Sequence, residues 1–359
     1  MKVAIIFPAK AHKPIGGYKI ALEYANRLAL DGYEVQLLYP IHIRGRRNVQ
    51  QKFYDFLRYI RFRNRFSVSD WFDLNQAIKE TVLPNFRELP DADIYICTSV
   101  ETAIAWNSAV KNDKARSFYF IQNFENWNVS TEELLETYHY PFTKIAISPY
   151  LVDAVVREGQ ECHYAPNGFD HSEYRMVTPI EEKEAATVSI LYHTQESKDF
   201  KTGLEALKAV HNKHPELKAL VFGAYECKED LPDWCEFFHN PDKATHNLIN
   251  NRAAIYLGPS RLEGFCLTIG EAMMCGQAVV CTDIPGYTVL ARNNETALVS
   301  PIGNAQALAD NIVRLIENQQ ERIRLARAGH DFIADYTYEK AYARFKEIIE
   351  SQISDSPQA

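Results

Sequence analysis

Two glutamates eight residues apart, Glu263 and Glu271, stand out in the stretch EGFCLTIGE. If the whole stretch were helical, the two carboxylates would lie about 12 Å apart and about 80° apart around the helix axis, a poor geometry for an acid/base pair. We therefore assign them to different elements. Gly264 is expected in a loop that follows a strand, and a helix is expected to begin near Thr268 and to end at Gly276.

A helix that follows a loop of small residues binds phosphate through its free N–H groups and its dipole. A glutamate one turn into such a helix would repel the phosphate unless it accepted hydrogen bonds from a donor such as a ribose 2′,3′-diol. A sugar ring offers similar donors to Glu263. The spacing thus favours one carboxylate per carbohydrate ring on either side of a diphosphate. A purely structural role stays open, because Thr268-Ile-Gly-Glu271 also fits a capping box.

Strand and helix patterns alternate along the 359 residues, a length that indicates about two domains. Eleven apolar runs are expected to be strands: 3–7, 34–39, 94–97, 117–121, 144–147, 162–165, 188–192, 217–222, 253–257, 278–281 and 297–299. The alternation predicts an α/β fold with two doubly wound parallel sheets, in which ligands bind at the carboxyl ends of the strands. The acidic segment 180–187 is expected to be a linker.

Composition excludes several classes of protein. No stretch approaches the roughly 18 apolar residues that cross a bilayer, and the N-terminus is expected to be a buried strand rather than a secretion signal, which favours a cytoplasmic protein. Seven cysteines without a C-x-x-C motif suit a reducing compartment. Cys227, Cys235 and His239 do not match the spacing of a common zinc site, so no metal is expected.

The segment 44–65 holds eight basic residues against one acid, in a chain whose net charge is −8. Phe53, Phe56, Leu57 and Ile60 fall at helical intervals. Two interpretations stay open: a helix on an anionic membrane surface, or a helix that packs on the core with its arginines solvated or gripping an anionic acceptor. Binding of nucleic acid is disfavoured, because no recognised module accompanies the charge.

The stretch PSRLEGFCLTIGEAMMCGQAVVCTDIPG at 259–286 resembles the donor-site signature of the retaining GT-B glycosyltransferases of family 4, E-G-F-G-L followed by E-A-M-A-x-G-x-P-V-V. Other family landmarks occur in order along the chain. They are Gly16-Gly17 after the first strand, PNGFD at 166–170, a lysine in the first loop of the second domain, and Tyr336-Thr-Tyr-Glu339 before the last helix.

The resemblance implies two Rossmann-like domains that face each other across a cleft. Residues 1–168 would form an acceptor domain, onto which a C-terminal helix at 338–359 packs back. Residues 169–337 would form the domain that holds a nucleotide-sugar donor.

The family pattern also implies roles for individual residues. Glu271 would bind the ribose, Glu263 the hydroxyls of the donor sugar, and Lys198 the phosphate. His193 stands where the family usually has arginine, so a neutral histidine would leave more of the leaving-group charge to Lys198. Further donor contacts are expected from the loops, at Gly16, Gly17, Gly264, Phe265, Cys266 and Leu267. Cys266 replaces the usual glycine of the signature.

The first domain has YFIQNFENW at 119–127, where many family members carry a histidine. Gln122 and Asn123 are expected on the acceptor side. Gln122 and Glu125 resemble the bacterial rhamnosyltransferase branch, which suggests synthesis of a surface polysaccharide. Glu125 and His12 are candidates for orienting the acceptor hydroxyl, and a structural role for either stays open.

The reaction that the resemblance implies is retaining transfer from a nucleotide sugar to a glycan or a lipid-linked saccharide, without a cofactor. An epimerase of the same fold and a non-catalytic scaffold at the inner face of the membrane are the alternatives. A metal-dependent GT-A transferase would need an Asp-x-Asp motif. Asp91-Ala-Asp93 has those letters, but it precedes a strand and is therefore expected at the wrong edge of the sheet.

Overall fold

The computed structural model describes residues 1–11, 13–43, 49–62, 67–86, 89–109 and 116–354. The chain divides into two units, one made of Met1–Pro166 with Ala341–Ala359 and the other of Asn167–Lys340. The corresponding predicted ranges were 1–168 with 338–359, and 169–337.

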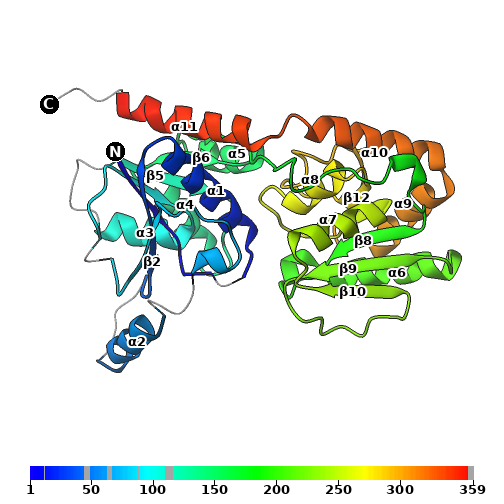
Figure 1. The fold of residues 1–359 in the computed structure, drawn as a ribbon, viewed down its shortest axis with the longest axis horizontal. Coiled ribbons are helices and arrows are strands. Elements are labelled where there is room, and N and C mark those ends of the chain that lie inside the picture. Colours follow the sequence, from blue (N-terminus) through cyan, green and yellow to red (C-terminus); the bar gives the residue numbers. More distant parts are fainter. Residues whose placement is uncertain (12, 44–48, 63–66, 87–88, 110–115, 355–359) are drawn as a thin grey trace. The chain divides into compact units, whose positions relative to one another are not determined.

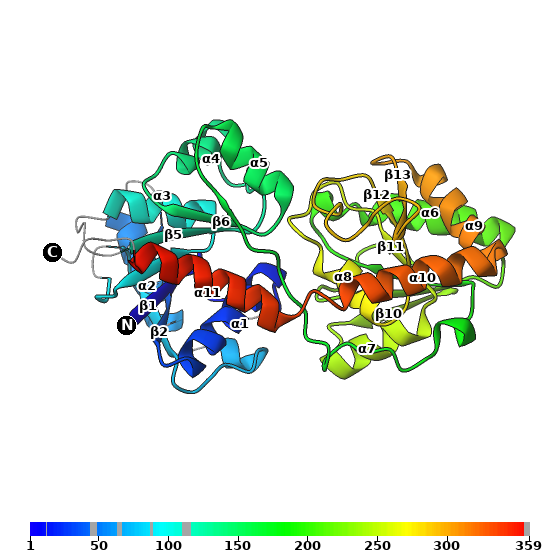
Figure 2. The same cartoon turned by 90° about the horizontal axis from the view of Figure 1, so that it is seen from above.

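The first unit contains a seven-stranded parallel sheet in the order β3-β2-β1-β4-β5-β6-β7 (Figure 1). Its strands are β1 (Lys2–Ile6), β2 (Glu34–Pro40), β3 (Lys79–Leu83), β4 (Ile94–Cys97), β5 (Arg116–Ile121), β6 (Thr143–Ala146) and β7 (His163–Tyr164). Its helices are α1 (Gly16–Leu30), α2 (Val49–Phe62), α3 (Val100–Ala109), α4 (Thr131–Tyr138), α5 (Pro149–Arg157) and α11 (Tyr338–Ser354). Helices lie on both faces of this sheet, with α3, α4 and α5 opposite α1 (Figure 2).

The last helix, α11, packs against α1 (Figure 2). The residues directly before α11 belong to the second unit. The ring of Phe345 lies 4.6 Å from that of Tyr24, centroid to centroid. The Tyr342 hydroxyl donates a hydrogen bond to Asp31 at 2.7 Å, and the Lys346 ammonium lies 2.6 Å from the same carboxylate. The chain therefore passes between the units twice, once near Pro166 and once near Lys340.

The second unit contains a six-stranded parallel sheet in the order β10-β9-β8-β11-β12-β13. Its strands are β8 (Thr187–Leu191), β9 (Lys218–Gly223), β10 (Cys235–His239), β11 (Ile255–Gly258), β12 (Ala278–Thr282) and β13 (Ala297–Ser300). Its helices are α6 (Phe200–Lys213), α7 (Lys243–Arg252), α8 (Leu267–Met274), α9 (Ala305–Glu317) and α10 (Gln319–Ile333).

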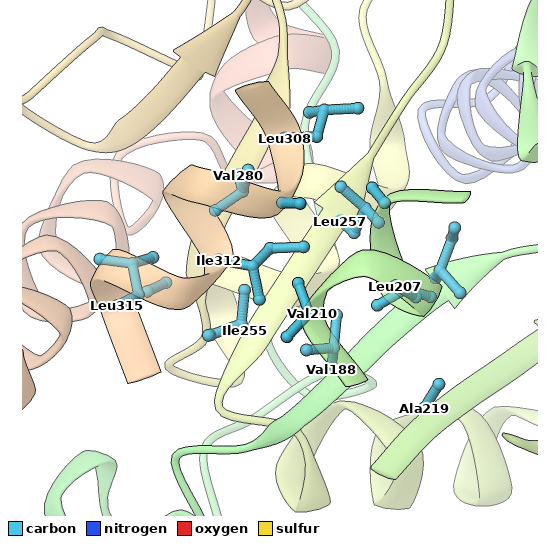
Figure 3. Packing of buried hydrophobic residues seen from close by; sticks show 14 of the residues in the cluster. Val188, Leu207, Val210, Ala219, Ile255, Leu257, Val280, Leu308, Ile312 and Leu315 are labelled. Carbon is cyan, nitrogen blue, oxygen red and sulfur yellow. The ribbon is translucent and has the colours of Figure 1, made fainter. Parts of the chain in front are cut away.

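Figure 3 shows how the core of the second unit is built from neighbouring strands and the helices that cover them. Val188, Ile255 and Val280 come from three adjacent strands and are fully buried. Val210 of α6 and Ile312 of α9 pack against them. A sheet that is covered on both faces needs runs of apolar residues rather than alternation, which is the pattern that these strands have.

The predicted α/β fold with two parallel sheets is confirmed, but two strands were missed. β3 (KETVL) and β10 (CEFFH) lie at the edges of their sheets, and several of their residues are partly exposed or fully exposed. Polar and charged residues interrupt both strands, so they lack the continuous apolar run that identified the others, and an edge position tolerates this because an edge strand is buried on fewer sides.

The predicted linker at 180–187 is wrong, because this segment belongs to the second unit. Ile180 is buried, and the Lys183 ammonium is buried where it donates hydrogen bonds to three backbone carbonyls at and after the end of α7. Those carbonyls belong to Asn250, Asn251 and Ala253, at distances of 2.8 to 3.0 Å. A polar, acidic segment was interpreted as a connection between domains, although its one lysine, Lys183, is a buried helix cap.

Across the described part of the chain, none of the helices has the length and apolar character that crossing a bilayer requires.

Candidate functional site

Two loops meet at the carboxyl edge of the second sheet, because the strands that precede them, β8 and β11, are hydrogen-bonded neighbours. The first loop follows β8 and contains the short 3-10 turn Glu196–Lys198, and the second follows β11. The Arg261 backbone N–H donates to the Ser197 carbonyl at 2.7 Å. The Arg261 side chain lies 2.7 Å from the Asp199 carboxylate. A backbone hydrogen bond and an ion pair thus join the two loops.

Lys198 and Glu263, one from each loop, form a buried ion pair. The ammonium lies 2.7 Å from both carboxylate oxygens, and Glu263 is only 8% exposed. The Ser260 hydroxyl donates to the same carboxylate at 2.9 Å. Burial alone would lower the pKa of Lys198, but the charge and hydrogen bonds of Glu263 outweigh it and raise that pKa. Lys198 therefore stays positively charged at neutral pH.

His193 lies at the start of the loop that carries Lys198. Its Nδ1 accepts a hydrogen bond from the Gln195 backbone N–H at 3.0 Å, which places the ring proton of the neutral form on Nε2. Burial, reinforced by the positive charge of Lys198, lowers the pKa of His193 to about 4. The imidazole is therefore neutral at pH 7 and offers a hydrogen-bond donor without a charge.

Helix α8 begins directly after Cys266, whose backbone is left-handed with φ 61° and ψ 82°. This conformation costs a residue with a Cβ roughly 1–2 kcal/mol, which explains why glycine suits the position. The Cys266 thiol lies 3.3 Å from the Thr268 hydroxyl. The helix starts one residue earlier than predicted and ends at Met274, and Gly276 follows with φ 74°.

Glu271 is the fifth residue of α8, so the capping-box interpretation is wrong. In a capping box the glutamate would lie three residues after the capping residue, which here is Cys266. The Thr268 hydroxyl, which would have been the cap, instead lies 2.7 Å from the Tyr256 hydroxyl. Glu271 is 7% exposed, and its charge adds to burial in raising the pKa of Tyr174.

Two glycines fix the backbone around these carboxylates. A Cβ on Gly270 would lie 2.0 Å from the ring of Phe169, so the PNGFD segment packs directly on α8. A Cβ on Gly286 would lie 2.0 Å from the Glu263 carbonyl oxygen. The final glycine of the signature is thus required by the close approach of the Glu263 loop.

In the first unit, four more of the predicted residues lie at the carboxyl edge of the sheet. Gly16 and Gly17 begin α1, and the Gln122 amide lies against Gly17, where a Cβ would be 3.3 Å from its oxygen. The Asn123 side-chain oxygen accepts hydrogen bonds from the Phe124 N–H at 2.9 Å and the Tyr150 hydroxyl at 3.3 Å. His12 lies outside the described residues.

Glu125 binds the start of helix α3, since its carboxylate accepts a hydrogen bond from the Val100 N–H at 2.7 Å. Burial raises the pKa of Glu125 to about 8; the bond to Val100 opposes this shift and the charge of Glu101 adds to it. The carboxyl group is therefore largely protonated at pH 7.

The sequence did not point to three residues that shape this site: Ser260, Arg261 and Asp199. Asp199 has a left-handed backbone, with φ 44°, at the start of α6. Ser260 is three residues before Glu263, so its position inside the signature was the available signal. Asp199 and Arg261 belong to loops that follow two different strands, so no local sequence pattern indicates that they pair.

Asp93 has a structural role, as expected of a residue that precedes β4. Its carboxylate accepts a hydrogen bond from the Lys2 backbone N–H at 2.7 Å, at the amino edge of the first sheet. In the part of the chain that the structure describes, no group of three histidine, cysteine or acidic side chains is arranged to hold a metal.

Comparison with known proteins shows which family and which fold the chain resembles. The family model "Glycosyl transferases group 1" matches residues 171–332, nearly all of the second unit. Among curated proteins, the phosphatidyl-myo-inositol mannosyltransferase of Mycobacterium tuberculosis is 24% identical over 207 residues. That alignment covers 54% of this chain and 55% of the mannosyltransferase, so the chain spans about half the length of this relative.

Two solved structures share the fold over almost the whole chain. Sucrose-phosphate synthase from Thermosynechococcus elongatus superimposes with a TM-score of 0.77 at 15% identity, covering 99% of this chain and 100% of the other. The Anabaena protein HepE, in complex with UDP and glucose, superimposes with a TM-score of 0.74 at 16% identity, covering 98% and 100%. The chain therefore has the GT-B fold, and its residues 171–332 match the model of the glycosyl transferases group 1 family.

Proposed function

We propose that this protein is a retaining glycosyltransferase. It would transfer a sugar from a nucleotide-sugar donor to a glycan or lipid-linked saccharide acceptor in the synthesis of a bacterial surface polysaccharide. The observation that carries the proposal is the arrangement at the carboxyl edge of the second sheet. There the Lys198–Glu263 ion pair joins the loops after β8 and β11. Glu271 is buried one turn into α8, the helix that follows the β11 loop.

This arrangement suits the three parts of a nucleotide sugar. The N–H groups that begin α8 and the Lys198 ammonium suit the diphosphate. Glu271 suits the ribose diol, and Glu263 suits the hydroxyls of the donor sugar. The HepE structure, which was solved with UDP and glucose, supports a donor of this class. The name of the mycobacterial relative, an enzyme that acts on phosphatidyl-myo-inositol, supports an acceptor on a lipid.

Catalysis would depend on positioning and on charge at the leaving group. The bond from the anomeric carbon to the phosphate oxygen breaks, and the bond to the acceptor oxygen forms on the same face of the sugar. The departing phosphate oxygen takes the acceptor proton. Because His193 is neutral, Lys198 supplies the positive charge of this loop as negative charge grows on the diphosphate.

The proposal is tested by incubating the purified protein with UDP-, GDP-, ADP- and dTDP-sugars and measuring thermal stabilisation, and then transfer to saccharide-diphosphate lipids. We expect one nucleotide class to stabilise the protein and to donate its sugar with the anomeric configuration retained, as read by NMR of the product. Release of an epimerised sugar without an acceptor would instead support the epimerase. Absence of any stabilisation would support a non-catalytic scaffold.

Glu271→Ala should weaken binding of the nucleotide sugar by about 1.5–3 kcal/mol for each charged hydrogen bond lost to the ribose. The reason is that Glu271 lies too far into α8 to serve as its N-terminal cap, and its carboxylate is buried in the first turns of the helix that follows the β11 loop. Calorimetric titration measures the effect. Glu295→Ala, which removes an exposed carboxylate from the same unit, is the control. Equal donor affinity in the Glu271 and Glu295 variants would remove Glu271 from the site.

We also propose that segment 44–65 brings the protein to an anionic membrane, where a lipid-linked acceptor is found. Within it, α2 exposes three large apolar side chains on one helical face: Tyr54 is 70% exposed, Leu57 45% and Ile60 47%. Residues 44–48 and 63–65, and the side chains of Phe53, Phe56 and Arg58, lie outside the described part of the structure. Basic residues near an anionic leaflet contribute up to about 1 kcal/mol each.

Membrane binding is tested by sedimentation with liposomes of phosphatidylglycerol and phosphatidylcholine, compared with phosphatidylcholine alone. The wild type should pellet with the anionic liposomes and be released by salt, because exposed charges are screened beyond about 8 Å at physiological ionic strength. The test variant exchanges four arginines for glutamine: Arg58, Arg61, Arg63 and Arg65. The control variant makes the same exchange at exposed lysines of the second unit: Lys201, Lys208, Lys213 and Lys218. Equal pelleting of the two variants would exclude the segment as the membrane contact.

On the acceptor side, we propose that Glu125 positions its loop by binding α3 in its protonated form. Glu125→Gln should therefore keep kcat near that of the wild type at pH 7, because a glutamine oxygen can accept the same bond from Val100. Glu125→Ala should lose about 1 kcal/mol of stability. If Glu125 were instead a base, the wild-type kcat would rise as the carboxyl group loses its proton around pH 8, and Glu125→Gln would abolish that rise.

A further inference from the structure

The side chains assigned to the diphosphate and to the donor sugar bind each other in this structure. The Lys198 ammonium contacts both oxygens of Glu263 at 2.7 Å. The side chain of Lys198 is 22% exposed and that of Glu263 9% exposed, so water reaches neither charge freely. A ligand that binds one partner must therefore change the bonding of the other.

Separation of such a pair is costly when only one partner finds a replacement. A buried charge that loses its counter-ion keeps its desolvation cost without the compensating attraction. A nucleoside diphosphate carries phosphate oxygens for Lys198 but has no sugar hydroxyls for Glu263. Its binding would pull Lys198 towards the phosphate and leave the Glu263 carboxylate with fewer donors.

Glu263 is also held in place, so it cannot simply follow Lys198 or turn to solvent. The Ser260 hydroxyl donates to its carboxylate at 2.9 Å, and the Ser260 carbonyl in turn accepts a hydrogen bond from the Thr282 hydroxyl. The Glu263 backbone is in close contact with Gly286. Its loop is bound to the Lys198 loop through Arg261 and Asp199.

An intact nucleotide sugar meets both needs at once. Its phosphate takes the ammonium, while the hydroxyls of its sugar donate hydrogen bonds to the carboxylate that the ammonium leaves. Binding of the diphosphate to Lys198 and binding of the sugar to Glu263 thus favour each other, because each replaces one partner of the ion pair.

We infer that the Lys198–Glu263 pair makes this site selective for the intact nucleotide sugar over the nucleoside diphosphate that transfer leaves behind. This inference rests on the proposed function and names a specificity device within the same site. After transfer, the sugar hydroxyls depart, and reformation of the ion pair helps to expel the nucleoside diphosphate.

The test uses matched probes: UDP with UDP-glucose, GDP with GDP-mannose, ADP with ADP-glucose and dTDP with dTDP-glucose, titrated by calorimetry at pH 7. For the pair that the wild type binds, the nucleotide sugar should bind at least about tenfold more tightly than the diphosphate. In Glu263→Gln, which frees Lys198 with little change in shape, the nucleoside diphosphate should bind about tenfold more tightly than it does to the wild type. The nucleotide sugar should bind more weakly than it does to the wild type.

The inference predicts that Glu263→Gln raises the affinity for the nucleoside diphosphate and lowers the affinity for the nucleotide sugar. If Glu263 only contacted the sugar, the affinity for the nucleoside diphosphate would be unchanged in Glu263→Gln, and this result, or a weaker affinity, would overturn the inference. Glu295→Gln controls for the loss of one negative charge from the same unit and should change neither affinity. A wild type that binds none of the eight probes would overturn the proposed function, and the inference with it.

Ser260→Ala gives an independent test if Glu263→Gln does not fold. It keeps both charges but removes one donor from Glu263, so the carboxylate depends more on Lys198. The nucleoside diphosphate should then lose more affinity than the nucleotide sugar does. An equal loss for both ligands, or no loss for the diphosphate, would contradict the inference.

Discussion

The ion pair between Lys198 and Glu263 joins residues 65 positions apart, and it exists because β8 and β11 are neighbours in one parallel sheet. The carboxyl ends of adjacent parallel strands meet at the same edge, so the loops that follow them also meet. The remaining features of the site follow from that placement. Arg261 reaches the Lys198 loop, Ser260 reaches Glu263, and α8 begins a few residues further on.

Several of the candidate site residues in both units are neutral at pH 7. In the loop that follows β8, His193 is neutral because of burial, and Lys198 keeps its charge because Glu263 holds it. In the first unit, burial keeps Glu125 largely protonated. A site in which the ionised groups are few and paired is suited to a ligand that brings its own charge, as a nucleoside diphosphate does.

Much of this site could be predicted from the sequence because its signals are local. The interval between Glu263 and Glu271, the glycines between them and the apolar runs around them predicted a loop, a helix and a parallel sheet. The start of α8 was predicted one residue late, because Cys266 adopts a left-handed backbone that glycine would have indicated more clearly. Thr268 resembled a helix cap because Glu271 follows it at the spacing of a capping box.

Other features depend on contacts between distant residues and could not be predicted. Nothing near Asp199 in the sequence indicates Arg261, and nothing near Lys183 indicates the carbonyls at and after the end of α7 that it caps. The edge strands β3 and β10 contain charged and polar residues, which an edge position tolerates, so they gave no continuous apolar run. Resemblance to a family suggested roles for individual residues, but the pairing of Lys198 with Glu263 became visible only in three dimensions.

The measurement that tests the account most directly is a crystal structure of the protein with the nucleotide sugar that stabilises it. We expect the Glu271 carboxylate within hydrogen-bond distance of the ribose hydroxyls, Glu263 bound to hydroxyls of the sugar, and the Lys198 ammonium bound to the diphosphate. A nucleotide bound elsewhere, or bound here with the Lys198–Glu263 pair intact and Glu271 without a ribose contact, would contradict it.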